Sequence, residues 1–211
     1  MSEAVPLGPD GFAAITGVSR ETMRRLEAYA ALLVGWSQRI NLVGRSTLAD
    51  LWRRHFLDSA QLLPMIPAGT RSLVDLGSGA GFPGLVLAIL GIPGVELVEA
   101  DRRKATFLSE VARITRAEVT LRACRIEAVT PRAVDVVTAR GCAPLDRLLP
   151  LAARFIGPQT TCLFLKGVQA EEELTVAGKA WTMTVSRQPS RSDPGGTVFL
   201  LQQVVREPRR D

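Results

Sequence analysis

Short apolar runs alternate with segments of helical spacing from residue 71 onward. The runs are bounded by turn residues and predict strands at 72–76, 95–99, 119–122, 134–138 and 161–166. Helices are predicted between them, for example at 103–115 and 145–155. Strands that alternate with helices predict an α/β fold built on a mostly parallel, doubly wound sheet.

The last two apolar segments predict a different connection. Segments 181–187 and 197–205 are joined by 188-QPSRSDPGG-196, which is too short for a crossover helix. They should therefore pair as an antiparallel hairpin. Together with the five earlier runs, they give a seven-stranded sheet.

Two helices are predicted ahead of the sheet. Ser19 is typical of an N-cap, and Leu26, Tyr29 and Leu33 follow it at helical spacing. A second helix should start at residue 46 or 47 and end before Pro64, with an apolar face that includes position 55.

The chain of 211 residues suits one α/β domain with a modest extension. We expect a helical extension at 1–67 and a sheet domain at 68–211, joined in one compact unit. Residues 1–18 are small and contain glycine and proline, so they are expected to be loosely held. No apolar run reaches membrane-spanning length, and no signal peptide is recognisable at the start.

Composition narrows the chemistry further. The three scattered cysteines suggest reduced thiols and a cytoplasmic protein, and a single histidine without a C-x-x-C motif argues against a zinc site. A net charge of +5 permits a polyanionic partner such as nucleic acid, although a solvated basic surface explains it about as well.

The stretch 72-SLVDLGSGAGFPG-84 carries the clearest chemical signal. Gly77, Gly79 and Gly81 lie between a buried strand and an apolar helix, where glycines let the backbone approach a ligand and helix N–H groups face an anion. Residues 79–84 fit the dinucleotide pattern G-x-G-x-x-G, whereas Asp75 with 77-GSGAG-81 resembles motif I of S-adenosylmethionine-dependent methyltransferases. The closing hairpin favours the methyltransferase version of the Rossmann-like fold.

Polar residues follow the later strands. Glu99 ends the second apolar run and is our choice to accept bonds from cofactor ribose hydroxyls; Asp101 is the alternative, or else the N-cap of the next helix. Ile126 and Glu127 follow the third strand, near the adenine position of such folds, although a simple turn is equally consistent with them.

Arg140 and Lys166 arrive at the carboxyl ends of the fourth and fifth strands, where open α/β sheets bind ligands. Either could instead pair with a surface carboxylate. His55 and Asp58 share a helical face and are interpreted as a structural hydrogen-bonded pair rather than a catalytic one; Arg54 could also pair with Asp58.

Six short motifs occur in a fixed order along the chain: 41-NLVG-44, 54-RHFLDS-59, 75-DLGSGAGFPG-84, 125-RIE-127, 139-AR-140 and 166-KG-167. In their order and spacing they resemble the RsmG (GidB) family of bacterial 16S rRNA guanine-N7 methyltransferases. The resemblance implies S-adenosylmethionine as cofactor, with contacts at Gly77, Phe82, Ile126, Glu127 and Arg140. One departure is Gly141, where many relatives carry alanine.

The resemblance also implies methyl transfer to N7 of a guanine in a loop of 16S rRNA, on free RNA or a small-subunit particle. N7 has a lone pair and no proton to lose, so the enzyme must orient and stabilise rather than supply a general base. No residue is therefore predicted to be catalytic with certainty; Arg140 and Lys166 are candidate donors. We expect a monomer without a metal. The alternatives are an NAD(P)-dependent oxidoreductase and a non-catalytic RNA-binding module.

Overall fold

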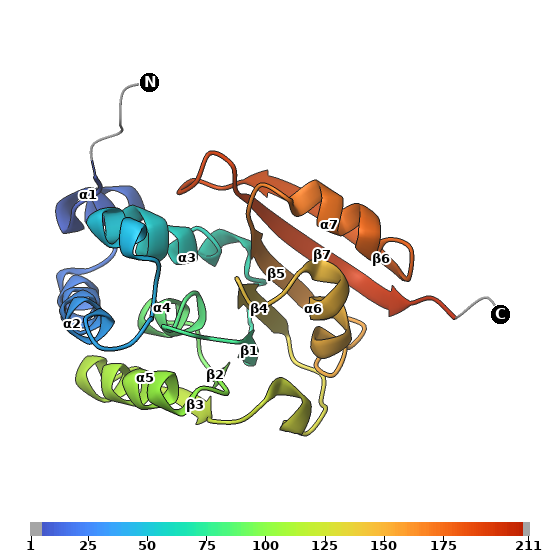
Figure 1. Ribbon diagram of the computed structural model, residues 1–211, viewed down its shortest axis with the longest axis horizontal. Helices are drawn as coiled ribbons and strands as arrows, with labels where there is room; N and C mark the ends of the chain where they lie inside the picture. The colour runs from blue at the N-terminus through green and yellow to red at the C-terminus, as the bar shows by residue number, and fades with distance from the viewer. Residues whose placement is uncertain (1–5, 209–211) are drawn as a thin grey trace.

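The computed structural model describes residues 6–208, which are built around one seven-stranded sheet (Figure 1). The strands are β1 (Leu73–Leu76), β2 (Val95–Val98), β3 (Val119–Arg122), β4 (Val136–Arg140), β5 (Thr161–Lys166), β6 (Trp181–Pro189) and β7 (Thr197–Arg206). Their order is β3-β2-β1-β4-β5-β7-β6. β1 to β5 are parallel, whereas β7 runs antiparallel to β5 and β6. The predicted α/β sheet with a closing hairpin is confirmed.

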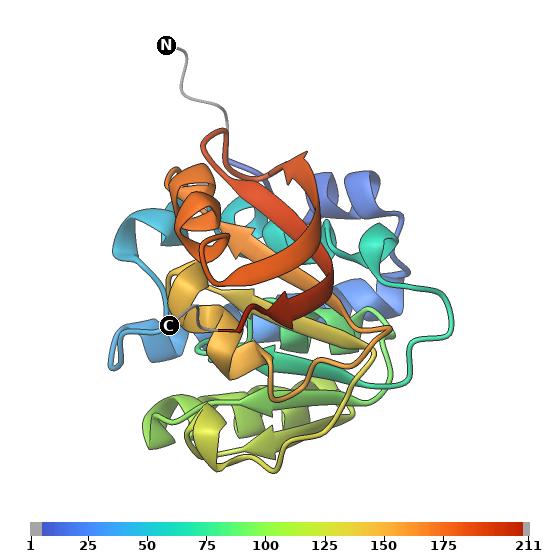
Figure 2. The same ribbon diagram turned by 90° about the vertical axis from the view of Figure 1, so that its right-hand side faces the viewer.

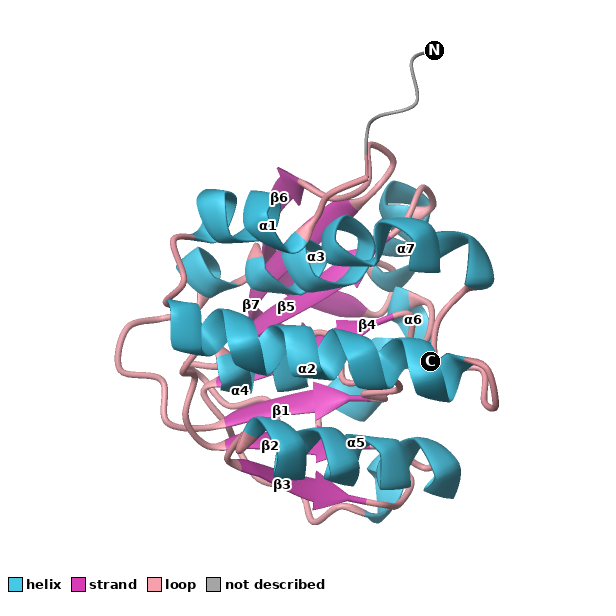
Figure 3. Cartoon of the chain, turned by 90° about the vertical axis from the view of Figure 1, so that its left-hand side faces the viewer, coloured by secondary structure: helices cyan, strands magenta, loops and turns pink. Residues whose placement is uncertain are grey.

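Helical segments cover both faces of this sheet. They are α1 (Pro9–Thr16), α2 (Arg20–Ser37), η1 (Arg45–Asp50), η2 (Trp52–Leu57), α3 (Asp58–Ala60), η3 (Leu63–Met65), α4 (Gly84–Ile89), α5 (Arg102–Thr115), η4 (Ile126–Ala128), α6 (Leu145–Ala152) and α7 (Ala170–Ala177). The N-terminal helices lie with α4 and α5 on the face seen in Figure 3. α6 and α7 lie on the side of the molecule turned to the viewer in Figure 2, beside the hairpin.

An aromatic cluster joins the N-terminal helices to the sheet. The ring of Tyr29 in α2 stacks on the ring of Phe82, which follows β1 in the chain, and the two ring centroids are 5.3 Å apart. Phe56 of η2 contacts both rings edge-on. Phe12 of α1 is fully buried beside Phe56. The expectation that residues 1–18 are loosely held is therefore wrong for α1, because burying Phe12 fixes that helix; residues 1–5 lie outside the described residues.

The second predicted N-terminal helix forms, but the type of helix changes along its length. η1 and η3 are 3-10 segments, η2 is a π-helix, and α3 is a short α-helix. At the end of η2 the amide of Asp58 donates to the carbonyls of Arg53 and His55, so it skips the Arg54 carbonyl that an α-helix would use. Such π turns are frequent at functional sites.

Two details of the fold differ from the sequence prediction. β4 begins at Val136, two residues later than expected, and continues to Arg140. The helix α7 was not predicted, although Ala170, Leu174 and Ala177 are buried at helical spacing and could have revealed it. Within residues 6–208, the helices are all too short or too polar to cross a membrane.

Candidate functional site

The glycine turn after β1 has one open side. Gly77, Gly79 and Gly81 all have positive φ angles, of 65°, 59° and 94°. A Cβ on Gly81 would lie 2.5 Å from the Tyr29 hydroxyl, whereas a Cβ on Gly79 would meet only the Gly77 carbonyl oxygen, at 3.7 Å. Gly81 thus makes room for protein atoms, and Gly79 faces space that the chain leaves free.

The N-terminal helix α2 holds this turn in place. The buried Tyr29 hydroxyl donates a hydrogen bond to the Ala80 carbonyl within the turn. Burial raises the Tyr29 pKa well above its ordinary value, so the hydroxyl keeps its proton and remains a donor. Helical spacing predicts that Tyr29 lies on the apolar face of a helix, but nothing in that spacing indicates that its hydroxyl reaches the glycine turn.

Glu99 and Asp101 separate into two roles. The Glu99 carboxylate is buried and accepts hydrogen bonds from the amides of Gly79 and Asp101, each at 2.7 Å. Asp101 caps α5 by accepting from the amides of Arg103 and Lys104, and these bonds lower the pKa of its carboxyl. Glu99 therefore touches the glycine turn, whereas Asp101 has the alternative role of an N-cap.

Two cavities open at the carboxyl ends of the strands. The turn cavity, about 320 Å³, is lined by Gly77, Gly79, Phe82, Glu99, Lys104 and neighbouring residues. The strand-end cavity, about 640 Å³, lies between η1–α3, the ends of β4 and β5, and the loop joining β6 to β7. Arg140, Gly141 and Cys142 line both cavities, so the end of β4 and the two residues after it form the boundary between them.

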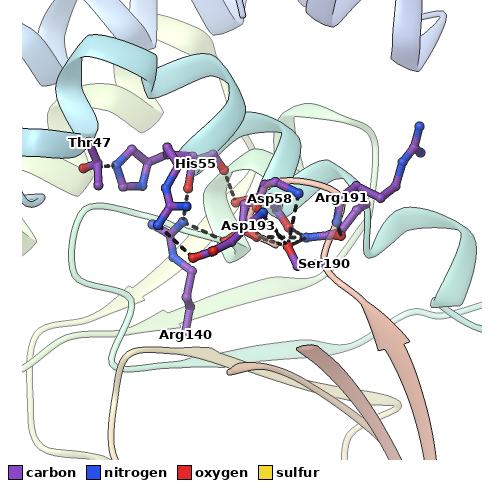
Figure 4. Close-up of polar contacts among 11 residues, drawn as sticks. Thr47, His55, Asp58, Arg140, Ser190, Arg191 and Asp193 are labelled. Atoms are coloured by element: carbon purple, nitrogen blue, oxygen red, sulfur yellow. Dashed lines mark hydrogen bonds and ion pairs between the residues drawn. The ribbon is translucent and has the colours of Figure 1, made fainter. Parts of the chain in front are cut away.

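Arg140 reaches from this boundary to the N-terminal segment. Its Nη1 donates to the Asp58 carboxylate and to the Arg54 carbonyl, both at 3.1 Å. Its guanidinium carbon lies 4.8 Å from the centre of the Phe82 ring, a cation–π contact. Figure 4 shows Arg140 rising from the sheet toward the segment that carries His55 and Asp58.

Asp58 also binds the loop between β6 and β7. Its Oδ1 accepts from Gln61 Nε2 at 2.9 Å and from the hydroxyls of Ser190 and Ser192. Arg54 pairs with Asp193 of the same loop at 2.9 Å. The predicted Arg54–Asp58 pair is therefore wrong, because the loop supplies Arg54 with a different carboxylate.

His55 is structural in its contacts but does not bond Asp58. The Thr47 hydroxyl donates to the Gly44 carbonyl at 2.7 Å, so His55 Nε2 donates to Thr47 Oγ1 at 2.8 Å. The imidazole stacks on Phe82, and its Nδ1 has no partner among residues 6–208. Burial, followed by the charges of Arg140 and Arg54, lowers the pKa of His55 to about 3. The predicted His55–Asp58 bond is thus wrong, since the ring faces Thr47.

The remaining predicted residues, Lys166, Ile126 and Glu127, lie outside the turn cavity or are held by other protein groups. Lys166 Nζ donates to the Ala143 carbonyl at 2.7 Å and pairs with Glu173 at 2.8 Å, although the side chain lines the strand-end cavity. Within η4, Ile126 is buried in the core and Glu127 is exposed. Neither of these two lines the turn cavity as the structure describes it.

The family described as rRNA small subunit methyltransferase G matches residues 22–192 of this chain. The chain belongs to this family. It is 58% identical over 200 residues to the ribosomal RNA small subunit methyltransferase G of Paramagnetospirillum magneticum, and the alignment covers 95% of this chain and 98% of the relative. The Rhodospirillum rubrum relative is also 58% identical, covering 94% of this chain and 98% of the relative.

Membership of the methyltransferase G family confirms the resemblance and the enzyme class expected from the sequence. The fold is also similar to that of a TehB-like SAM-dependent methyltransferase from Corynebacterium glutamicum, with a TM-score of 0.57 and 15% identity. That alignment covers 83% of this chain and 96% of the other. The Rossmann-like methyltransferase fold predicted from the glycine turn and hairpin is therefore confirmed. The match to residues 22–192 includes every residue that lines the turn cavity, and all those that line the strand-end cavity except Asp193 and Gly196.

Proposed function

We propose that this protein transfers a methyl group from S-adenosylmethionine to N7 of a guanine in a loop of 16S ribosomal RNA. The observation that carries the proposal is the pair of cavities that meet at Arg140, in a chain of the methyltransferase G family. One cavity adjoins the glycine turn and suits the cofactor. The larger one adjoins it and suits an unstacked base.

The turn cavity fits a nucleoside cofactor. The open side of Gly79 permits close approach, and the Glu99 carboxylate beside it is an acceptor of the kind that ribose hydroxyls require. We assign cofactor binding to Gly77, Gly79, Gly81, Phe82, Glu99 and Arg140, and to Ile126 and Glu127 at the adenine side. When bound, S-adenosylmethionine supplies an electrophilic methyl group.

Among the described residues that line the strand-end cavity, neither His55 nor Lys166 is placed to take a proton, which suits acceptance at N7. Burial lowers the pKa of His55 to about 3, so its imidazole is a weak base, and the unpartnered Nδ1 is buried. Lys166 is held by Glu173 and the Ala143 carbonyl. Guanine N7 carries a lone pair and loses no proton, so orientation of the base suffices there; orientation can contribute up to about 7–11 kcal/mol to catalysis.

The finer assignments follow from the same proposal. The partner is 16S rRNA, alone or in a small-subunit particle, and the net charge of +5 favours approach to that polyanion. The free state of all three cysteines is consistent with a cytoplasmic enzyme. We further propose that it acts as a monomer, with residues 1–67 serving as a helical extension of the domain at 68–211.

The deciding experiment is a methyl-transfer assay with labelled cofactor on free 16S rRNA and on small-subunit particles, followed by mapping of the modified base. We expect one guanine to acquire an N7 methyl group. A matched Glu99→Ala variant should lose transfer in the same assay. Methylation of a different atom, or binding of NADH in preference to S-adenosylhomocysteine, would refute the proposal.

A further inference from the structure

The guanidinium of Arg140 is only partly occupied by the protein. Nη1 makes both of its hydrogen bonds, to Asp58 and to the Arg54 carbonyl. Within residues 6–208, Nε and Nη2 have no hydrogen-bond acceptor, and the side chain is 19% exposed. These free N–H groups belong to a fork that lies over Phe82, at the wall of the turn cavity. A planar fork of this kind matches the two oxygens of a carboxylate or phosphate.

The π turn explains why Nη1 of Arg140 makes two hydrogen bonds to the same segment. The amide of Asp58 donates to Arg53 and His55 rather than to Arg54. The Arg54 carbonyl is thereby left for Arg140, and the Asp58 carboxylate follows it in the chain. Both acceptors therefore come from one turn of η2 and α3, and they hold the same nitrogen.

The Asp58 carboxylate is itself held in one orientation. Its Oδ1 accepts from Gln61, Ser190 and Ser192, so Oδ2 is left for Arg140. The residue is buried, with 9% of its surface exposed. A charged carboxylate that is fixed on one side by three donors can in turn fix the guanidinium on the other.

We propose that Asp58 is a positioning residue for the cofactor: it holds Arg140 so that the free edge of the guanidinium binds the carboxylate of the methionine moiety. This inference rests on the proposed function. Asp58 itself does not touch the cofactor. The cofactor carboxylate is favoured over an RNA phosphate because the guanidinium stacks on Phe82 of the glycine turn and lines the turn cavity.

The test is the variant Asp58→Asn. Every partner of the Asp58 side chain donates to it, so an amide must set its NH₂ group against either Arg140 or the Gln61 side. Two probes are compared by calorimetry: S-adenosylhomocysteine, which carries the amino-acid carboxylate, and 5′-methylthioadenosine, which lacks it. The variant should bind the first about tenfold more weakly, as expected for loss of a charge-assisted contact, and the second within about twofold of wild type.

Glu96→Gln is the matched control, because Glu96 is a buried carboxylate that pairs with Arg122 and Arg132 away from both cavities. It should change neither affinity. Equal losses for both probes in Asp58→Asn would show a general collapse of the cavity and overturn the inference. Unchanged affinity for S-adenosylhomocysteine would overturn it too.

A thermal melt first establishes that Asp58→Asn is folded. If it is not, Arg140→Lys replaces it, since lysine keeps the charge but lacks the fork, and the same selective loss is expected. If that variant binds both probes with unchanged affinity, the inference is refuted. Failure of the wild-type protein to bind S-adenosylhomocysteine would refute the proposed function instead, so the two failures are distinguishable.

Discussion

The histidine beside the strand-end cavity makes protein stability depend on pH in a calculable way. His55 has a pKa of about 3 in the folded protein, against an ordinary value of 6.5. Between these values the unfolded chain binds a proton that the folded protein excludes. The stability contributed by neutral His55 is therefore fully present above pH 6.5 and is lost as the pH falls toward 3.

The magnitude follows from this difference in pKa. At pH 5 the unfolded state gains the free energy of protonating an imidazole of pKa 6.5, which is about 2 kcal/mol. Because the chain has only one histidine, removing its side chain removes this term alone. Other groups that titrate, such as the buried Asp75 with its raised pKa, are shared by wild type and variant and cancel in the comparison.

The assay is urea unfolding of wild type and His55→Gln at about pH 8 and about pH 5, analysed as a two-state transition. Glutamine retains a donor for Thr47 but does not titrate. Between the two pH values, wild type should lose about 2 kcal/mol more stability than the variant. Losses that agree within about 0.5 kcal/mol, the usual error of additivity, would refute the reasoning and show that His55 titrates as in water.

Three further predictions concern the turn cavity. Gly79→Val should abolish S-adenosylhomocysteine binding in calorimetry, because its side chain enters the open side of the turn; retained affinity in a folded variant would remove the turn from the site. Glu99→Ala should weaken that binding by about 1.5–3 kcal/mol, whereas Asp101→Ala should leave it unchanged and lower stability in urea unfolding, and the reverse pattern would exchange their roles. Tyr29→Phe leaves the Ala80 carbonyl without its donor and should lower stability by about 1–3 kcal/mol and weaken cofactor binding, both of which calorimetry can measure; unchanged values would mean that the turn holds itself.

The sequence predicted the sheet and the position of the candidate residues that lie directly at strand ends. Glu99 and Arg140 were proposed because each ends an apolar run, and in a parallel sheet those ends meet at one edge. The glycine turn was found because its residues are consecutive. These features depend on local pattern and on a general rule of topology.

The partners of these residues could not be predicted in the same way. The spacing of Tyr29 predicts only a core position, yet its hydroxyl donates to the Ala80 carbonyl of the glycine turn. Asp58 and Arg140 are 82 residues apart in the sequence, so no local pattern connects them. Spacing on one helix suggested a bond from His55 to Asp58, but the π turn and the loop after β6 direct the two side chains elsewhere. Long-range pairing and side-chain direction leave no periodic trace in a single sequence.

The order in which the ribosome makes this chain has a consequence for the contacts of Asp58. Asp58 and Ser192 are 134 residues apart, whereas Tyr29 and Ala80 are 51 apart. At roughly 5–20 residues per second, Asp58 is made about 7–27 s before its serine partner. Through that interval the carboxylate lacks the hydroxyls that later orient it, while the contact between Tyr29 and the glycine turn can already form. We therefore expect the glycine turn to be held by Tyr29 before Asp58 is oriented, because the loop that carries Ser192 is made late in translation.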